Sequence, residues 1–246
     1  MNLDVIFSAS EVTSDRVAGK TVVVIDVLRA TSVMVTALNN GASRVIPVLS
    51  PKEAFEYRAS HHEDIILVGE RNASAIEGFD YSNSPLDMVP SVVKGRTLVM
   101  TTTNGTRAIR AAKDAAELFV ASFLNSEATI NILKQRDDVV LIASGNSGSF
   151  NIEDTLCAGY MVELLNSCSD ISRELTDAAV AANQLFIDVR DDLHKLAALG
   201  NHYRLLKSKG LDEDLLYCFR RDCIDLVCMR ENGAIVSQMP QGVYLK

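Results

Sequence analysis

One stretch of the sequence, VVVIDVLRATSVMVTAL from Val22 to Leu38, constrains the fold more than any other part of the chain. It begins with four consecutive β-branched residues, a run that is typical of a strand buried on both faces of a parallel sheet. The run ends at Asp26, and after several polar residues a mostly apolar helix is predicted to extend to about Asn39. The stretch therefore predicts a buried strand, a polar loop and a helix.

The polar loop after this strand is the first candidate site. Asp26, Arg29, Thr31 and Ser32 lie within seven positions of one another. In open α/β sheets, ligands bind at the carboxyl ends of strands and near helix N-termini, where free backbone N–H groups attract anions. A structural alternative stays open, in which Asp26 pairs with Arg29 while Thr31 or Ser32 caps the helix.

Polar residues also follow three later strands that we expect at residues 65–68, 97–100 and 139–143. Their loops carry hydroxyl groups and arginines, and two carboxylates begin the helix after the last strand. The candidate catalytic carboxylates are Asp26, Glu70, Glu153 and Asp154. The candidate substrate-binding residues are Arg29, Thr31, Ser32, Arg71, Thr103, Asn104, Gly105, Thr106, Arg107, Ser144 and Gly145.

Clustered carboxylates repel one another unless a cation or a proton intervenes. Oxygen ligands alone indicate a hard metal such as magnesium, which is typically held between one or two carboxylates and a substrate phosphate. Arginines and helix N-termini would hold a phosphoryl group and a second acidic group. The pattern therefore favours metal-assisted phosphoryl transfer or hydrolysis.

Other classes of site have less support. The sequence contains no GxxxxGK[ST] phosphate loop, no GxGxxG at the first strand and no GxSxG serine motif. The four histidines lie outside the strand-end loops, and we expect them at the surface: His61, His62, His194 and His202. Histidine-based zinc or triad catalysis is therefore disfavoured.

Composition places the chain among ordinary soluble proteins. With 246 residues and a formal charge of −8, it lacks the basic surface that nucleic acid requires, although a small anionic substrate remains compatible. No signal peptide and no membrane-spanning run is visible, and the five cysteines show no CxxC pair. We therefore expect a cytoplasmic protein with reduced thiols and no membrane partner.

The chain shows no linker, so we expect a single domain over residues 1–246. Residues 73–90 are predicted to form a long functional loop. Residues 172–200 have one long helical pattern, which is predicted either to pack internally or to form an oligomer surface. Residues 226–239 are typical of a hairpin with a type I′ turn at Asn232 and Gly233. We expect the C-terminal helices and the hairpin to pack on the sheet.

Five blocks of this sequence together resemble the 2-phosphosulfolactate phosphatase family, also called the ComB family. The blocks are VVVIDVLRATS, GERNASAIEGFDYSNSP, TTTNGTRAI, ASFLN and IEDTLCAG. The resemblance implies a three-layer α/β/α fold of its own type with a mostly parallel or mixed sheet. It also implies a magnesium-dependent hydrolysis of 2-phosphosulfolactate to 3-sulfolactate and phosphate, as in coenzyme M biosynthesis. Bacterial relatives would also use other 2-hydroxy acid phosphates.

The resemblance suggests roles for the candidate residues. Asp26 and Asp154 are the first choices for magnesium, followed by Glu70 and Glu153. Arg29, Arg71 and Arg107 would share the charges of the substrate, and backbone N–H groups near residues 104–106 and 144–146 would bind its oxygens. Asp26 would act as a covalent nucleophile, or a metal-bound water would attack instead. The family blocks also contain Glu77, Asp80, Asn83 and Cys157; for the cysteine we expect a packing role.

One loop departs from the family pattern. Relatives tend to carry more charge before IEDTLCAG, often with an arginine near the position of Ser149, where this chain has GNSGSF. If that arginine binds the sulfonate of the substrate, the selectivity of this chain is altered. Two alternatives therefore stay open: a phosphatase for another small acid, and a non-catalytic anion-binding protein.

Overall fold

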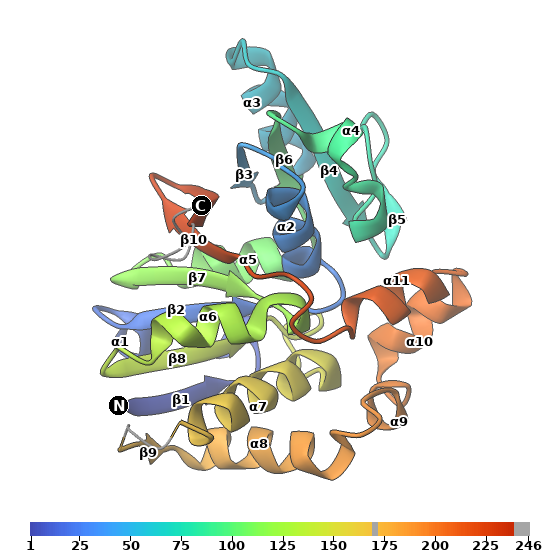
Figure 1. Ribbon diagram of the computed structural model, residues 1–246. Coiled ribbons are helices and arrows are strands. Elements are labelled where there is room, and N and C mark those ends of the chain that lie inside the picture. The colour runs from blue at the N-terminus through green and yellow to red at the C-terminus, as the bar shows by residue number, and fades with distance from the viewer. Residues whose placement is uncertain (169–171, 239–246) are drawn as a thin grey trace, which may run out of the picture.

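The computed structural model describes residues 1–168 and 172–238 and shows an α/β fold (Figure 1). Eleven strands form one mixed sheet in the order β5-β4-β6-β3-β11-β10-β7-β2-β8-β1-β9. Helices cover both faces of this sheet, as the predicted three-layer α/β/α arrangement requires. The strands are β1 (Asn2–Ile6), β2 (Thr21–Ile25), β3 (Arg44–Pro47), β4 (Ile65–Arg71), β5 (Ser74–Ala75), β6 (Thr97–Thr101), β7 (Glu117–Ala121), β8 (Asp138–Ala143), β9 (Glu174–Leu175), β10 (Val227–Glu231) and β11 (Ala234–Gln238).

The α-helices of the described residues follow most strands directly. They are α1 (Ser14–Val17), α2 (Ala30–Asn39), α3 (Pro51–Ser60), α4 (Pro90–Val93), α5 (Gly105–Ala111), α6 (Ser126–Leu133), α7 (Ile152–Asn166), α8 (Asp177–Val189), α9 (His194–Ala197), α10 (Asn201–Ser208) and α11 (Asp212–Cys218). Three short 3-10 helices are η1 (Ala9–Glu11), η2 (Pro85–Asp87) and η3 (Phe123–Asn125). None of the helices in the described part of the chain is long and apolar enough to cross a membrane.

Strand β2 is buried on both faces, as its β-branched run predicts. Val23 and Ile25 belong to one core with α7 and α8, whereas Val22 and Val24 belong to a second core with α2 and α5. Alternate side chains of a strand point to opposite faces, so one strand of this composition supplies both layers of helices. This burial fits the position of β2 inside the larger parallel group, between β7 and β8.

The C-terminal hairpin lies within the sheet, which corrects the expectation that it packs on the sheet. β10 pairs antiparallel with β7, and β11 pairs antiparallel with β3, so the hairpin joins two groups of parallel strands. Its turn has the predicted positive φ angles, 49° at Asn232 and 84° at Gly233. The hairpin occupies this place because β7 and β3 would otherwise present unpaired backbone groups. Residue 239, at the end of the predicted hairpin, lies outside the described residues.

The prediction of one long helix over residues 172–200 is wrong, because this segment contains β9, α8 and α9. Glu174 and Leu175 pair with β1, which commits their backbone to the sheet. Thr176 then begins α8 by accepting a hydrogen bond from Ala179 N. Periodicity alone does not reveal a two-residue strand that is held by its neighbour.

The loop over residues 73–90 also contains structure of its own, namely β5 and η2. Asp80 accepts a hydrogen bond from Leu67 N at 2.8 Å, which fastens the loop to β4. Asn40 donates to the carbonyl of Met88 at 2.6 Å and fastens its other end to α2. The loop is therefore fastened to the middle of β4 and to the C-terminus of α2.

Candidate active site

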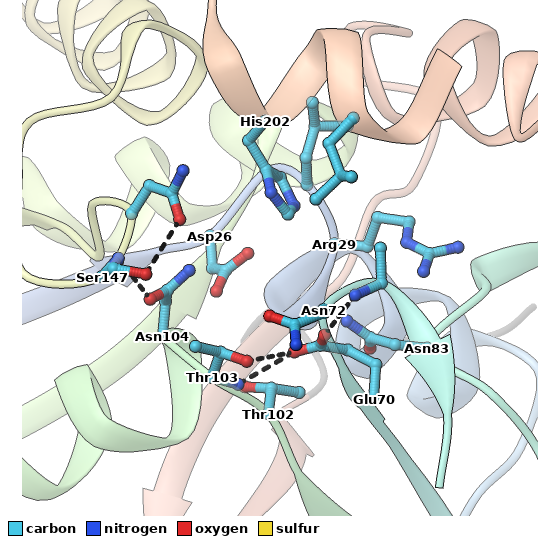
Figure 2. Close-up of a pocket in the computed structure, with 14 residues that line it drawn as sticks. Asp26, Arg29, Glu70, Asn72, Asn83, Thr102, Thr103, Asn104, Ser147 and His202 are labelled. Carbon is cyan, nitrogen blue, oxygen red and sulfur yellow. Dashed lines mark hydrogen bonds between the residues drawn. The ribbon is translucent and has the colours of Figure 1, made fainter. Parts of the chain in front are cut away.

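The carboxyl ends of the two parallel groups converge on one small polar cavity of about 50 Å³ (Figure 2). β4 and β6 run in a different direction from β2 and β8, so the ends of both groups reach the same region (Figure 1). Fourteen residues line the cavity: Asp26, Leu28, Arg29, Glu70, Asn72, Ala73, Asn83, Thr102, Thr103, Asn104, Asn146, Ser147, His202 and Leu205. The loops after β2, β4, β6 and β8 therefore all contribute to this one cavity, which makes it the candidate site.

Asp26 is the central carboxylate of this cavity, although only 5% of the residue is exposed. Its Oδ1 accepts a hydrogen bond from Ala30 N at 3.1 Å, at the first turn of α2. Burial, together with the negative charge of Glu70, raises the pKa of Asp26 to about 7, against the hydrogen bonds from Ala30 and Gly105. A carboxylate with this pKa changes its protonation state near neutral pH, which suits a reacting group.

Gly105 approaches Asp26 so closely that no side chain fits between them. A Cβ atom on Gly105 would lie 2.7 Å from Oδ2 of Asp26 and 2.5 Å from Cβ of Ala30. This contact packs the N-terminus of α5 against the loop after β2. The glycine predicted as substrate-binding therefore positions the carboxylate through its backbone.

Thr31 and Ser32 have structural roles, but neither caps α2, whose N-cap residue is Arg29 and which has no side-chain cap hydrogen bond. The Thr31 hydroxyl and the Asp26 backbone are hydrogen-bonded at 2.9 Å, and the Ser32 hydroxyl donates to the carbonyl of Val27 at 2.8 Å. Neither hydroxyl lines the cavity. The proposed pairing of Asp26 with Arg29 is not formed, because Arg29 has another partner.

Arg29 forms a buried ion pair with Asp214 of α11. The second oxygen of Asp214 accepts a hydrogen bond from the hydroxyl of Ser84 at 2.7 Å. Arg29 is nevertheless among the residues that line the cavity. Asp214 was absent from the predicted site, and no signal near position 214 marks it as the partner of residue 29.

Glu70 connects the loops after β4 and β6. Its Oε1 accepts hydrogen bonds from the backbone N and the hydroxyl of Thr103, both at 2.9 Å, and its Oε2 accepts one from Ala73 N at 2.8 Å (Figure 2). Because its two oxygens already accept three hydrogen bonds, Glu70 chiefly fixes the two loops. It lines the cavity beside Asp26 and contributes negative charge there.

Three lining residues adopt the left-handed backbone conformation although none of them is glycine. Their φ angles are 53° at Asn72, 56° at Ala73 and 51° at Ser147. The strain at Ser147 is held in place by its backbone N, which donates to Asn104 Oδ1 at 3.0 Å. Residues with strained backbone conformations of this kind cluster at functional sites, where many surrounding contacts hold them in place.

Asp154 lies behind the cavity rather than on its lining. Its Oδ1 accepts a hydrogen bond from Val27 N at 2.7 Å, and its Oδ2 accepts from Gly145 N at 3.2 Å and from the amide of Asn151 at 2.8 Å. Burial and the neighbouring charges of Asp26 and Glu153 raise its pKa well above the usual range. With both oxygens in use, Asp154 joins the loops after β2 and β8 and is placed poorly for a metal ion.

Most N–H groups of the expected backbone cradle have partners within the protein. In the loop after β8, Ser144 N donates to Ile25 O and Asn146 N donates to Ser149 O, both at 2.8 Å. In α5, Thr106 N donates to the hydroxyl of Thr102 at 3.2 Å. These three donors are therefore not free to bind a ligand.

Two of the three predicted arginines also lie outside the cavity lining. The Arg71 guanidinium donates to the carbonyl of Glu70 at 2.7 Å and to the hydroxyl of Thr101 at 3.0 Å. Arg107 is exposed on α5. The sequence shows that an arginine lies near a strand end. The direction of its side chain depends on which face of the helix it occupies and on which other hydrogen-bond acceptors lie within reach.

His202 corrects the expectation that all four histidines are surface residues. It lies at the start of α10, lines the cavity and faces the side of Asp26 (Figure 2). Burial lowers its pKa, against the charge of Glu70 and a hydrogen bond to the Leu28 backbone, which raise it. His61 and His62 are exposed as expected. Nothing in the local sequence places His202 near a strand end, because α10 reaches the cavity only through the tertiary fold.

Cys157 is completely buried among the side chains of the core that contains α7 and α8. Its sulfur lies 3.8 Å from the Ser126 hydroxyl, and burial raises the pKa of the thiol well above its usual range. The packing role is therefore confirmed. Of the long-loop residues in the family block, Asn83 lines the cavity, whereas Glu77 and Asp80 do not.

The cavity offers oxygen atoms that suit magnesium. Asp26 presents a buried carboxylate with a raised pKa, and Asn83 has a buried Oδ1 that lacks a hydrogen-bond partner among the described residues. No group of three or more His, Cys, Asp or Glu side chains in residues 1–168 and 172–238 is arranged to hold a metal ion. Magnesium commonly takes only one or two carboxylates and completes its shell with water and phosphate, so the donor set fits.

In α/β proteins with open sheets, ligands bind at the carboxyl ends of the strands, which is where this buried polar cavity lies. The family model for 2-phosphosulpholactate phosphatase matches residues 6–233 of this chain. The chain therefore belongs to the 2-phosphosulpholactate phosphatase family, a family of phosphoric monoester hydrolases. The family resemblance inferred from the five sequence blocks is confirmed.

Three clostridial relatives illustrate the similarity, and each is named a probable 2-phosphosulfolactate phosphatase. The protein from Clostridium novyi is 45% identical over 92% of this chain and 96% of its own length. The Clostridium acetobutylicum protein is 43% identical over 96% of this chain and 100% of its own length. The Clostridium perfringens protein of strain SM101 is 44% identical over 96% of each chain.

Proposed function

We propose that this protein is a magnesium-dependent phosphatase that hydrolyses 2-phosphosulfolactate, or a similar 2-hydroxy acid phosphate, to 3-sulfolactate or the corresponding acid and phosphate. Family membership and the names of the relatives support the phosphatase chemistry. One observation carries the assignment of the site: a buried carboxylate, Asp26, with its pKa raised to about 7, lines the same cavity as Arg29.

Magnesium, when bound, would neutralise part of the charge of the phosphoryl group. Asp26 is the carboxylate that would hold it, and Asn83, whose Oδ1 has no hydrogen-bond partner among the described residues, is a further oxygen-bearing residue of the same lining. Asp154 would position Asp26 without touching the ligand, because the hydrogen bonds that it accepts from Val27 and Gly145 fix the loops after β2 and β8. We therefore assign Asp154 a positioning role in place of the expected metal ligation.

The protein's own groups account for substrate orientation. Arg29 is held rigidly by Asp214 and would bind an oxygen of the phosphoryl group or the carboxylate of the substrate. Glu70 keeps the loops of Ala73 and Thr103 in position on the opposite wall. A preorganised site of this kind lowers the barrier by orienting reacting groups before the reaction begins.

Asp26 is the proposed reacting carboxylate, and two routes are chemically balanced. In the first route, a carboxylate oxygen of Asp26 bonds to phosphorus as the bond to the ester oxygen breaks, and water then hydrolyses the acyl phosphate. In the second route, a water oxygen bonds to phosphorus and its proton passes to Asp26. His202 in its protonated form would supply the proton that the departing ester oxygen takes up in either route; because burial lowers its pKa, this form is favoured at acidic pH.

The test is phosphate release from 2-phosphosulfolactate and 2-phospholactate, measured with magnesium and with EDTA. The proposal expects release from both esters that EDTA abolishes and magnesium restores. Absence of release from every ester would leave a non-catalytic anion-binding protein. Borohydride trapping during turnover separates the two routes, because only direct attack by Asp26 forms an acyl phosphate, which borohydride reduces to homoserine at that position.

A further inference from the structure

A cavity of about 340 Å³ lies outside the candidate active site, where the turn of the C-terminal hairpin meets α5. It shares no lining residue with the active-site cavity. Three segments that are far apart in the sequence form it: the loop after β3 with the start of α3, α5 with the turn that follows it, and the hairpin at β10. Figure 1 shows α5 beside β10, and Nη2 of Arg230 donates to the carbonyl of Ala115 at 3.0 Å. This bond fixes one wall of the cavity to the other.

The lining of this cavity carries an excess of positive charge. Arg110, Lys113 and Arg230 contribute three cations, against the single carboxylate of Glu53. Oε2 of Glu53 accepts a hydrogen bond from Leu49 N at 3.1 Å, so this carboxylate belongs to the start of α3. None of the ion pairs found in the described part of the chain includes any of these four charged residues. The excess is unusual in a chain with a formal charge of −8, because carboxylates are available to pair with most cations.

The cationic groups of Arg110 and Lys113 are accessible to a ligand. Both residues are exposed, and within residues 1–168 and 172–238 neither side chain makes a hydrogen bond or an ion pair. Arg230 is half-buried, and its bond to the segment after α5 holds it in place. A guanidinium has five N–H donors, so this bond leaves others for an anion. The cavity therefore offers donors and positive charge without an internal partner for either.

The remaining part of the lining is largely apolar. Pro47, Leu49 and Ile109 line the cavity, and Leu49 is 37% exposed. An exposed apolar side chain gains free energy when a ligand removes it from water. The volume lies within the range of about 300–1,000 Å³ that is typical of small-molecule sites, which combine an apolar lining with a few polar groups. Charge and apolar surface together favour an anion that carries an apolar portion.

We propose that this cavity is a binding site for a small organic phosphate. Its phosphate group would contact Arg110 and Lys113, and its apolar portion would lie against Leu49 and Ile109. A phosphate dianion matches two cations that lack an internal partner, and guanidinium groups bind its oxygens in pairs. The site is separate from the proposed phosphatase activity, because it lacks Asp26 and every other residue of the active-site lining.

Phenylphosphonate is the probe for this site, because it carries an anionic head and an apolar ring but no ester bond to hydrolyse. Isothermal titration calorimetry in a mildly alkaline, phosphate-free buffer measures its Kd for the whole protein. Methylphosphonate has the same head without the ring. We expect phenylphosphonate to bind at least about threefold more tightly, because the ring buries apolar surface. Binding of both should weaken as the salt concentration rises.

Two double variants locate the bound probe. Arg110→Ala with Lys113→Ala removes both accessible cations and should raise the Kd of phenylphosphonate by about tenfold or more. Arg190→Ala with Lys195→Ala is the matched control, since it removes two exposed cations outside the cavity and changes the net charge equally. The control should leave Kd within about twofold, because distant charges are screened by salt.

A single substitution tests the apolar wall independently of charge. Leu49→Ser, at an exposed position of the lining, should weaken binding of phenylphosphonate and leave that of methylphosphonate unchanged. Circular dichroism checks that each variant is folded. If the cavity double variant does not fold, Leu49→Ser carries the comparison.

The results overturn the inference in three cases. No measurable binding to the wild-type protein excludes the site. A Kd that is unchanged in the cavity double variant places the probe elsewhere, such as in the active site, and an equal rise in the control variant shows an effect of net charge alone. Equal affinity for the two phosphonates, or equal effects of Leu49→Ser on both, excludes the apolar contact. Because no turnover is measured, these outcomes are independent of the phosphatase assay.

Discussion

The guanidinium of Arg29 is ion-paired with the carboxylate of Asp214, although the two residues are 185 positions apart in the chain. Their side chains are 2% and 4% exposed, so the pair is almost completely shielded from water. Arg29 precedes α2 and Asp214 belongs to α11. The C-terminal part of the chain therefore fixes the arginine that lines the candidate active site.

Substitution Asp214→Asn should destabilise the protein strongly, because it leaves the charge of Arg29 buried without a counter-charge. We expect the free energy of unfolding to fall by about 3–5 kcal/mol. Urea denaturation measures this loss. Asp64→Asn, which breaks the exposed ion pair with Arg96, is the control and should cost at most about 1 kcal/mol. Similar losses in the two variants would contradict the importance of burial.

Asp26→Asn should abolish most of the activity without unfolding the protein. Loss of the reacting carboxylate should lower kcat by about 10²–10⁴-fold. The side chain keeps its shape, and removal of a buried carboxylate lessens the repulsion with Asp154, so the melting temperature should not fall. Steady-state kinetics and thermal melts check both results, with the exposed Asp15→Asn as control. Near-normal turnover in Asp26→Asn would refute the assignment.

The stability of the metal-free protein should decrease as pH rises toward neutrality. The pKa of Asp26 is about 7 in the folded protein against an ordinary value of 3.8, so the folded state binds the proton more tightly than the unfolded state. The stabilisation is therefore complete below about pH 4 and is lost as pH rises through 7. Glu153, with its pKa also raised to about 7, acts in the same direction.

Thermal melts in EDTA between about pH 4 and 8 measure this dependence. In the Asp26→Asn variant, the melting temperature should depend less strongly on pH than in the wild-type protein. Added magnesium should stabilise the wild-type protein more at pH 8 than at pH 5, because the ionised carboxylate is the form that binds a cation. A magnesium effect that does not vary with pH would argue against Asp26 as a ligand.

Gly105→Ala should lower activity through Asp26, because the new methyl group would lie 2.7 Å from its Oδ2. We expect kcat to fall by at least tenfold and stability to fall by about 1–3 kcal/mol. The double variant with Ala30→Gly relieves the second close contact, at 2.5 Å, and separates the two effects. Recovery of activity in the double variant would show that Ala30, rather than Asp26, is the group disturbed.

His202→Gln should impair hydrolysis according to the leaving group. With an alkyl phosphate the departing oxygen needs a proton, so kcat should fall by about 10²-fold or more. With p-nitrophenyl phosphate, whose leaving group is stable without a proton, the loss should be much smaller. His194→Gln, which removes a hydrogen bond to Tyr203 away from the cavity, is the matched control. Equal losses on both esters would indicate a purely structural role for His202.

Local patterns in the sequence were enough to predict the strands and helices that surround the site. The β-branched run at Val22 predicted a strand buried on both faces, and the Asn232–Gly233 pair predicted a tight hairpin turn. Asp26 and Glu70 were predicted at strand ends and both line the cavity. These features depend only on residues within a few positions of one another, so the local sequence is enough to predict them.

Only the tertiary structure decided which of the polar groups at these strand ends face a ligand. Asp154 lies behind the cavity because Val27 and Gly145 occupy its oxygens, whereas His202 lines the cavity because α10 reaches it from the C-terminal third. The sequence by itself therefore determined most strands and helices around the site and the central carboxylate. The partners of buried charges depend on which distant segments pack together, because periodicity encodes burial of a side chain but not the identity of the group that it meets.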